Sequence, residues 1–133
     1  MSFPSRILLV EDEQILAQNL KTFLLRYAAD VRIASDGEQA ISMLSSFVPD
    51  VAVLDYGLPG LNGLQTYREI ARRCGHHVAC VMITGFPLER ISHLAGRHGI
   101  RHVLCKPFSL GEFQQHVHRS AEELSALVCA TPP

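Results

Sequence analysis

Lysine is scarce in this chain of 133 residues, which holds two lysines beside ten arginines. Acidic and basic residues nearly balance, and the formal net charge is −1 at pH 7. The chain therefore lacks the positive excess that binding of nucleic acid by this segment would need. It also lacks an apolar run long enough to cross a membrane, so we expect no membrane-spanning segment.

The four cysteines, Cys74, Cys80, Cys105 and Cys129, show no C-x-x-C spacing. We expect reduced thiols, with Cys80 and Cys105 buried as small apolar residues. A zinc site at His76–His77 beside Cys74 and Cys80 can be imagined, but the spacing fits no common ligand pattern. The N-terminus lacks the apolar region of a signal peptide, so we expect a cytoplasmic protein.

Short apolar runs alternate with segments of helical period, which is typical of βαβ units. We expect strands at residues 6–10, 31–34, 51–54, 78–83 and 100–105, and helices at about 14–27, 64–74 and 88–98, with two more beginning at about 37 and 110. The pattern predicts one doubly wound α/β domain over residues 1–133, with a core at about 6–127 and a tail or the start of a linker at 128–133. The runs at 51–54 and 78–83 are apolar nearly throughout and indicate central strands.

Four of these runs stop at residues suited to phosphoryl chemistry, namely Glu11–Asp12, Asp55, Thr84 and Lys106–Pro107. Because the carboxyl ends of parallel strands lie at one edge of a sheet, we expect these residues to lie close together. Clustered carboxylates repel one another unless a cation lies between them. Mg²⁺ binds one or two carboxylates and keeps several waters, so we predict a magnesium site among the acids.

Each residue also has a simpler interpretation. Asp12 could cap the helix that follows it, and Asp55 could be an ordinary turn residue. Threonine is common in strands, so Thr84 alone says little, and Lys106 could be a surface lysine. However, an unpaired carboxylate at the end of a buried strand is costly, and Lys106 could pair with Asp55 and then with a phosphoryl oxygen. Taken together, the residues predict a phosphoryl-transfer site in which a carboxylate attacks the phosphorus.

The motifs at the strand ends resemble those of the receiver domains of bacterial two-component response regulators. They are Leu9–Glu13, Val53–Gly63, Thr84–Gly85 and Lys106–Phe108. The resemblance covers about residues 6–127 and implies a flavodoxin-like fold of five βα units with the sheet order 2-1-3-4-5. It also implies that the Lys106–Pro107 peptide bond is often cis.

The resemblance further implies a signalling role in which Asp55 takes a phosphoryl group from a histidine kinase or phosphotransfer protein and the domain regulates a partner. Mg²⁺ would be bound by Asp12, Asp55 and the backbone carbonyl of Gly57, and by Glu11 either directly or through a water, while Thr84 and Lys106 would hold the phosphoryl oxygens. The partner surface, and that of a homodimer, would be the helix at 88–98, the strand at 100–105 and the last helix, with Arg90, Ile91, Leu94 and Arg97 on the first of these. An alternative is that Ile91 and Leu94 only face the core.

Val103 departs from the family pattern, because an aromatic switch residue commonly lies three positions before the lysine. A receiver-like module that is not phosphorylated is therefore one alternative. A phosphatase of the haloacid-dehalogenase type is another, although Gly57 stands where such enzymes carry a second aspartate. A flavodoxin-like cofactor binder is disfavoured because acids, which repel phosphate, follow the first strand. The domain could stand alone or precede an output domain beyond Pro133.

Overall fold

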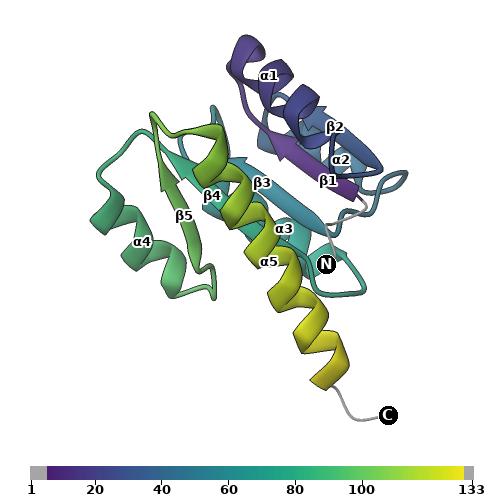
Figure 1. Ribbon diagram of the computed structural model, residues 1–133. Helices are drawn as coiled ribbons and strands as arrows, with labels where there is room; N and C mark the ends of the chain where they lie inside the picture. The colour runs from purple at the N-terminus through teal and green to yellow at the C-terminus, as the bar shows by residue number, and fades with distance from the viewer. Residues whose placement is uncertain (1–5, 131–133) are drawn as a thin grey trace.

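The computed structural model describes residues 6–130, which form one parallel sheet covered by helices on both faces (Figure 1). The strands are β1 Arg6–Val10, β2 Asp30–Ala34, β3 Val51–Asp55, β4 Ala79–Thr84 and β5 His102–Cys105. The helices are α1 Gln14–Leu24, α2 Gly37–Met43, α3 Gly63–Arg73, α4 Leu88–Gly96 and α5 Leu110–Ala130. The strand order is β2-β1-β3-β4-β5, and every pair is parallel. The predicted flavodoxin-like (βα)5 fold is confirmed.

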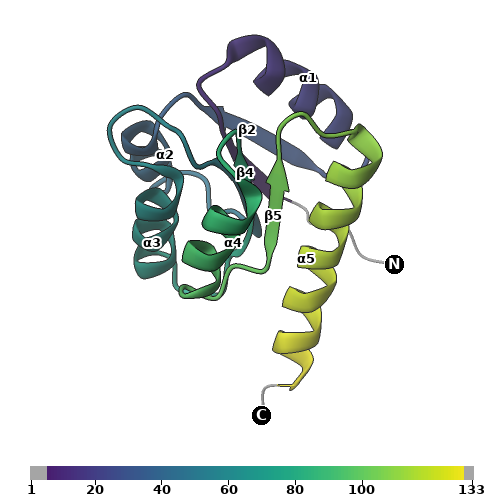
Figure 2. The ribbon, with the colours of Figure 1, turned by 90° about the vertical axis from the view of Figure 1, so that its left-hand side faces the viewer.

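The sheet separates two apolar cores. Helices α2, α3 and α4 cover one face, while α1 and α5 cover the other, as Figure 2 shows along the edge of the sheet. Strand β3 is buried along its whole length because it lies in the middle of the sheet. Alternate residues of β5 serve the two cores, since Val103 packs with the first and Leu104 with the second.

Local sequence signals explain where several helices begin and end. The side chain of Asp36 accepts a hydrogen bond from the Gln39 backbone at the start of α2. Ser109 does the same for the Glu112 backbone at the start of α5, and the Glu112 side chain accepts from the Ser109 amide in return, which completes a capping box. Gly99 follows α4 with a φ of 77°, a left-handed conformation that glycine adopts without strain.

The predicted boundaries need small corrections. Helix α1 ends at Leu24 rather than near residue 27, because the chain turns there and the Tyr27 and Ala28 amides both donate to the Leu24 carbonyl. Strand β5 begins at His102 rather than at residue 100. Helix α5 continues to Ala130, so only residues 131–133 of the predicted tail remain, and these lie outside the described residues.

Of the two cysteines that we expect to be buried, only one is. Cys80 is buried as expected, but Cys105 is only half-buried because it lies at the end of the edge strand β5. Over residues 6–130, no helix combines the length and the apolar character needed to cross a membrane.

Candidate functional site

The carboxyl ends of β1, β3, β4 and β5 meet at one edge of the sheet, as the sequence predicts. The pairing places Asp55 opposite Ile83 on β4, and Thr84 opposite Cys105 on β5. Lys106 follows directly, and its amide donates to the Thr84 carbonyl over 2.7 Å. The Lys106–Pro107 peptide bond is cis, as the resemblance implies.

Lys106 lies among three acids at this edge. Its Nζ donates to Asp55 Oδ2 at 2.9 Å, and lies 3.2 Å from Glu11 Oε2 and 3.8 Å from Glu13 Oε1. Burial acts to lower the pKa of the ammonium group, but the hydrogen bond to Asp55 and the negative charges of Asp55 and Glu11 outweigh it, so the net pKa is raised. Lys106 therefore stays charged, and one cation faces an excess of negative charge.

Glu11 is the most constrained of the acids, because its side chain is fully buried. Its Oε1 accepts a hydrogen bond from the Glu13 amide at 3.1 Å. Its Oε2 lies within ion-pair distance of Lys106 but has no aligned hydrogen-bond donor. Burial raises the pKa of Glu11 to about 7; the Glu13 amide opposes this shift, and the nearby charge of Asp55 adds to it. A buried carboxylate oxygen with unused acceptor capacity is suited to a cation.

Asp12 completes a group of three carboxylates. Oxygens of Glu11, Asp12 and Asp55 all lie within 4.8 Å of one another, and Asp12 is exposed. Over the described part of the chain, this is the only group of three or more His, Cys, Asp or Glu side chains that could hold a metal ion, so the imagined zinc site has no support. The interpretation of Asp12 as a helix cap is wrong, because the N-cap of α1 is Glu13 and no side-chain cap bond forms.

The loop after β3 fixes the side chain of Asp55 through a backbone hydrogen bond. The Gly57 amide donates to Asp55 Oδ1 over 3.0 Å, and the Gly63 amide donates to the Tyr56 carbonyl over 2.9 Å. A Cβ on Gly63 would collide with the backbone carbonyl of Asp55 and lie 2.8 Å from Tyr56 Cα. Glycine therefore lets the start of α3 approach the end of β3.

Thr84 is fully buried at the end of β4. Its Oγ1 accepts a hydrogen bond from the Phe86 amide at 2.8 Å. The Phe86 ring, which is half exposed, meets the Tyr56 ring edge-on with a centroid distance of 5.7 Å. The two loops beside Asp55 thus contact each other through aromatic rings.

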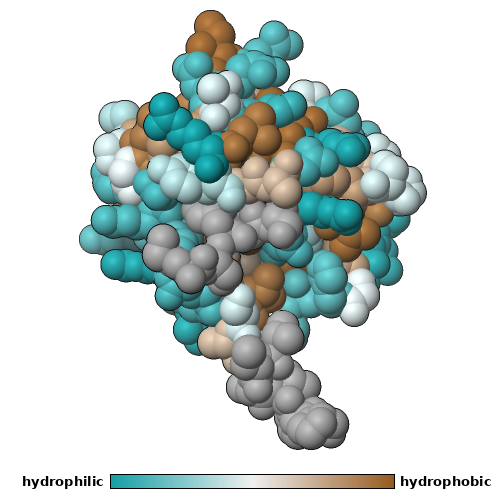
Figure 3. Space-filling model, turned by 45° about the vertical axis from the view of Figure 1, so that its right-hand side comes forward, coloured by the Kyte–Doolittle hydropathy of each residue, from teal (hydrophilic) through white to brown (hydrophobic). Residues whose placement is uncertain are grey.

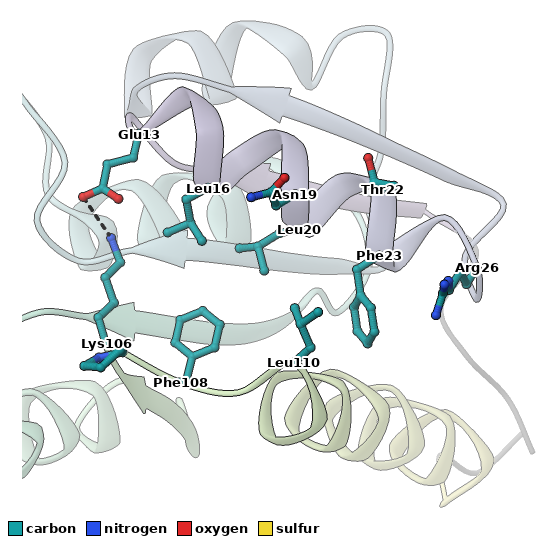
Figure 4. Close-up of a pocket in the computed structure, with 11 residues that line it drawn as sticks. Glu13, Leu16, Asn19, Leu20, Thr22, Phe23, Arg26, Lys106, Phe108 and Leu110 are labelled. Atoms are coloured by element: carbon teal, nitrogen blue, oxygen red, sulfur yellow. Dashed lines mark ion pairs between the residues drawn. The ribbon is translucent and has the colours of Figure 1, made fainter.

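An apolar groove adjoins the site on the side of α1 and α5. Figure 4 shows Leu16, Leu20 and Phe23 of α1 facing Phe108 and Leu110 across this groove, with the Glu13–Lys106 ion pair at its end. In Figure 3, apolar residues reach the surface among hydrophilic ones in the upper part of the molecule, where α1 lies in Figure 1.

Sequence reasoning missed two features. Glu13 was not among the candidate residues, although its position two residues beyond Glu11 places it beside Lys106. A cluster of His102, His116 and Glu123 joins β5 to α5. The period of two in strands could have placed His102 on the same face as Leu104, towards α5, but nothing in the sequence indicates its partners.

The family described as "Response regulator receiver domain" matches residues 7–118. The chain is 33% identical to the transcriptional regulatory protein TrcR of Mycobacterium tuberculosis, over 90% of this chain and 50% of TrcR. It is 31% identical to the two-component response regulator PhoP of Pseudomonas aeruginosa, over 95% of this chain and 56% of PhoP. The chain thus spans about half the length of these relatives.

A solved structure has the same fold. The response regulator receiver domain protein of Clostridium thermocellum superposes with a TM-score of 0.80 at 24% identity, covering 92% of this chain and 98% of that one. The fold, the family match and the relatives together place the chain in one class of signalling module. The chain belongs to the response regulator receiver domain family of two-component systems.

Proposed function

We propose that Asp55 is the phosphoacceptor of this receiver domain and that a histidine kinase or phosphotransfer protein supplies the phosphoryl group. This proposal rests on the hydrogen bond that Lys106 Nζ donates to Asp55 Oδ2 over 2.9 Å, at the carboxyl edge of the sheet. The Asp55 carboxylate would attack the phosphorus of a phosphohistidine. The bond from phosphorus to the imidazole nitrogen would break, and its electron pair would leave with the imidazole.

Neighbouring residues are suited to hold the transferred group. Lys106 can turn from the carboxylate of Asp55 to an oxygen of the phosphoryl group, because its four-carbon stem is flexible. Thr84 Oγ1 accepts from the Phe86 amide, which leaves its own proton available for a phosphoryl oxygen. Positioning and charge of this kind account for most of the catalysis of phosphoryl transfer.

We propose that Glu11, Asp12, Asp55 and the Gly57 carbonyl hold Mg²⁺. The buried Oε2 of Glu11, which has no hydrogen-bond donor, supports this assignment, as does the all-oxygen donor set. The exposure of Asp12 leaves room for the waters that Mg²⁺ retains. Bound Mg²⁺ would supply positive charge to the oxygens of the phosphoryl group.

The test is to treat the purified protein with a small acyl phosphate and Mg²⁺ and to map the phosphorylated residue. We expect modification of Asp55, and none in Asp55→Asn, whose fold circular dichroism should show to be intact. Asp30→Asn is the matched control, because Asp30 lies on the edge strand β2 in an exposed pair with Arg32. Modification of a different residue would contradict the assignment, and a failure of both Mg²⁺ binding and labelling would favour the receiver-like module that is not phosphorylated.

We propose that the phosphodonor docks over the groove between α1 and the start of α5. The groove is apolar, adjoins Lys106 and suits an amphipathic helix. Leu110, at the start of α5, lines the groove and is 47% exposed. Leu110→Asp should slow transfer from the cognate phosphodonor and leave labelling by a small acyl phosphate unchanged.

A second surface, α4–β5–α5, stays our proposal for the regulated partner or a homodimer. The buried Ile91 and the half-buried Leu94 pack in the core, so the alternative interpretation of these two residues is correct. The surface depends instead on Arg90 and Arg97, which are exposed. Self-association that does not change when both arginines are replaced by alanine would count against it.

We also propose that the domain does not turn over small phosphate esters. Gly57, two residues after Asp55, has no carboxylate that could serve as a general acid or base for a second step. Steady release of phosphate from a monoester by the purified protein would contradict this.

A cytoplasmic location fits the free thiols of the described Cys74, Cys80 and Cys105.

A further inference from the structure

Two histidines and a glutamate form a hydrogen-bonded chain between β5 and α5, at the end of β5 remote from Lys106. Nδ1 of His102 lies 3.1 Å from Nδ1 of His116, and Nε2 of His102 lies 2.9 Å from Glu123 Oε2. The rings meet edge-on with a centroid distance of 5.3 Å. His102 is only 8% exposed, so water can do little to replace these partners. None of the three takes part in the proposed phosphoryl transfer.

The geometry limits how many protons the two imidazoles can hold. An ionised carboxylate only accepts hydrogen bonds, so the His102 Nε2 that faces Glu123 carries a proton. The one proton between the two Nδ1 atoms then belongs to His116 while the pair is neutral. One added proton goes to Nε2 of His116, and the shared proton can then lie on either ring. A second would set two N–H groups against each other across 3.1 Å, with no acceptor between them.

The surroundings act mainly against a charge on His116. Burial lowers its pKa, the charges of His102 and Arg119 lower it further, and Glu112 acts in the opposite direction. A neighbouring cavity, which His102 and Glu123 help to line, brings in the remaining titratable or charged groups. They are Tyr67 of α3, His77 before β4, Cys80 of β4 and Arg101 before β5.

A transition-metal ion is the other ligand that two facing imidazole nitrogens could share. Residues 6–126, whose side chains are described, offer no third ligand here, because the only group of three is the acidic one at the other end of the sheet. The charge of Arg119 acts on His116 and would also repel a cation. A shared proton is therefore favoured over a metal ion.

We propose that His102, His116 and Glu123 form a pH-sensitive latch, which holds α5 on β5 while the two imidazoles carry at most one added proton between them. With α5 released, both imidazoles can be protonated in water. The released state thus binds one proton more than the latched state at low pH, and the latch weakens as the pH falls. Uptake of one proton changes the opening equilibrium at most about tenfold per pH unit.

The test is hydrogen exchange of the α5 backbone amides between about pH 7 and about pH 5, the range in which histidine titrates, corrected for the intrinsic pH dependence of exchange and with a chelator present. His116→Asn keeps an amide donor near the Nδ1 position and removes the titrating group. In the unaltered protein, we expect the equilibrium constant for opening of α5 to rise up to about tenfold for each unit by which the pH falls. In His116→Asn, it should be nearly independent of pH. His76→Asn, in the exposed loop before β4, should behave like the unaltered protein. The same pH dependence in all three proteins would overturn the latch.

Nuclear magnetic resonance of the imidazole nitrogens tests the unaltered protein, even if His116→Asn fails to fold. The second proton uptake by the pair should coincide with the loss of α5 protection. Two charged imidazoles with α5 still protected would overturn the proposal. So would protection by added Zn²⁺ that disappears in His116→Asn, because it would make the pair a metal site.

Discussion

The two ends of β5 carry two charged clusters that are built in opposite ways. Beyond its carboxyl end, Lys106 is a single cation among several acids, and one buried oxygen of Glu11 lacks a hydrogen-bond donor. At its amino end, the facing nitrogens of His102 are both paired, with His116 and Glu123. An incomplete cluster is costly to stability but ready to bind, whereas a complete one holds elements together. The contrast suggests binding at the first cluster and docking of a helix at the second.

The largest effect is expected from removing the cation of the incomplete cluster. In Lys106→Met, labelling of Asp55 by a small acyl phosphate should fall about 100-fold, because one preorganised charge at the transferring group is lost. The other lysine of the chain supplies the control. Lys21→Met, on α1, should label at the normal rate, and equal rates in the two variants would mean that Lys106 does not touch the phosphoryl group.

Mg²⁺ should complete the same cluster in a pH-dependent way. The pKa of Glu11 is raised to about 7, so this carboxyl must lose a proton before it can hold a cation at neutral pH. We expect the affinity for Mg²⁺ to rise about tenfold between about pH 6 and about pH 8, with release of protons. Titration calorimetry in buffers of different ionisation enthalpy measures both quantities. An affinity independent of pH would mean that Glu11 stays outside the metal site.

Glu11→Gln tests the same group from the side of stability. Folding raises the pKa of Glu11 from 4.5 to about 7, so its contribution to stability is present below about pH 4.5 and is lost as the pH rises through 7. Without Mg²⁺, the variant should therefore be more stable than the unaltered protein at about pH 8, by on the order of 2 kcal/mol. Added Mg²⁺ should reduce this difference, because it stabilises the unaltered protein more. Urea unfolding measures the effect.

Glu13→Gln is the control for this experiment, since the Glu13 side chain is 64% exposed and its backbone amide, which bonds Glu11, is kept. It should change the free energy of unfolding little. If Glu11→Gln is instead less stable than the unaltered protein at high pH without Mg²⁺, the attraction between Glu11 and Lys106 outweighs the cost of burying the Glu11 charge.

The sequence predicts the two clusters unequally well. The convergence of Asp55 and Lys106 follows from strand ends alone, because parallel strands present their carboxyl ends at one edge. The cluster at His102 depends on which residues of α5 lie over β5, and this is set by packing of the helix on the sheet rather than by spacing along the chain. The raised pKa of Glu11 could not be predicted from spacing either, because it depends on how the folded chain buries that side chain. Element types were therefore predictable, whereas helix ends such as Leu24 and these contacts were not.

The smallest effect is expected at Val103, which lies between the two clusters but faces the opposite core. Val103→Ala removes two methyl groups from a half-buried position and should lower the free energy of unfolding by about 1 kcal/mol. Because an aliphatic side chain neither donates to Asp55 nor contacts the His102 chain, labelling of Asp55 and the pH dependence of α5 exchange should both stay unchanged. A change in either would show that the two ends of β5 are coupled through residue 103, even without an aromatic ring there.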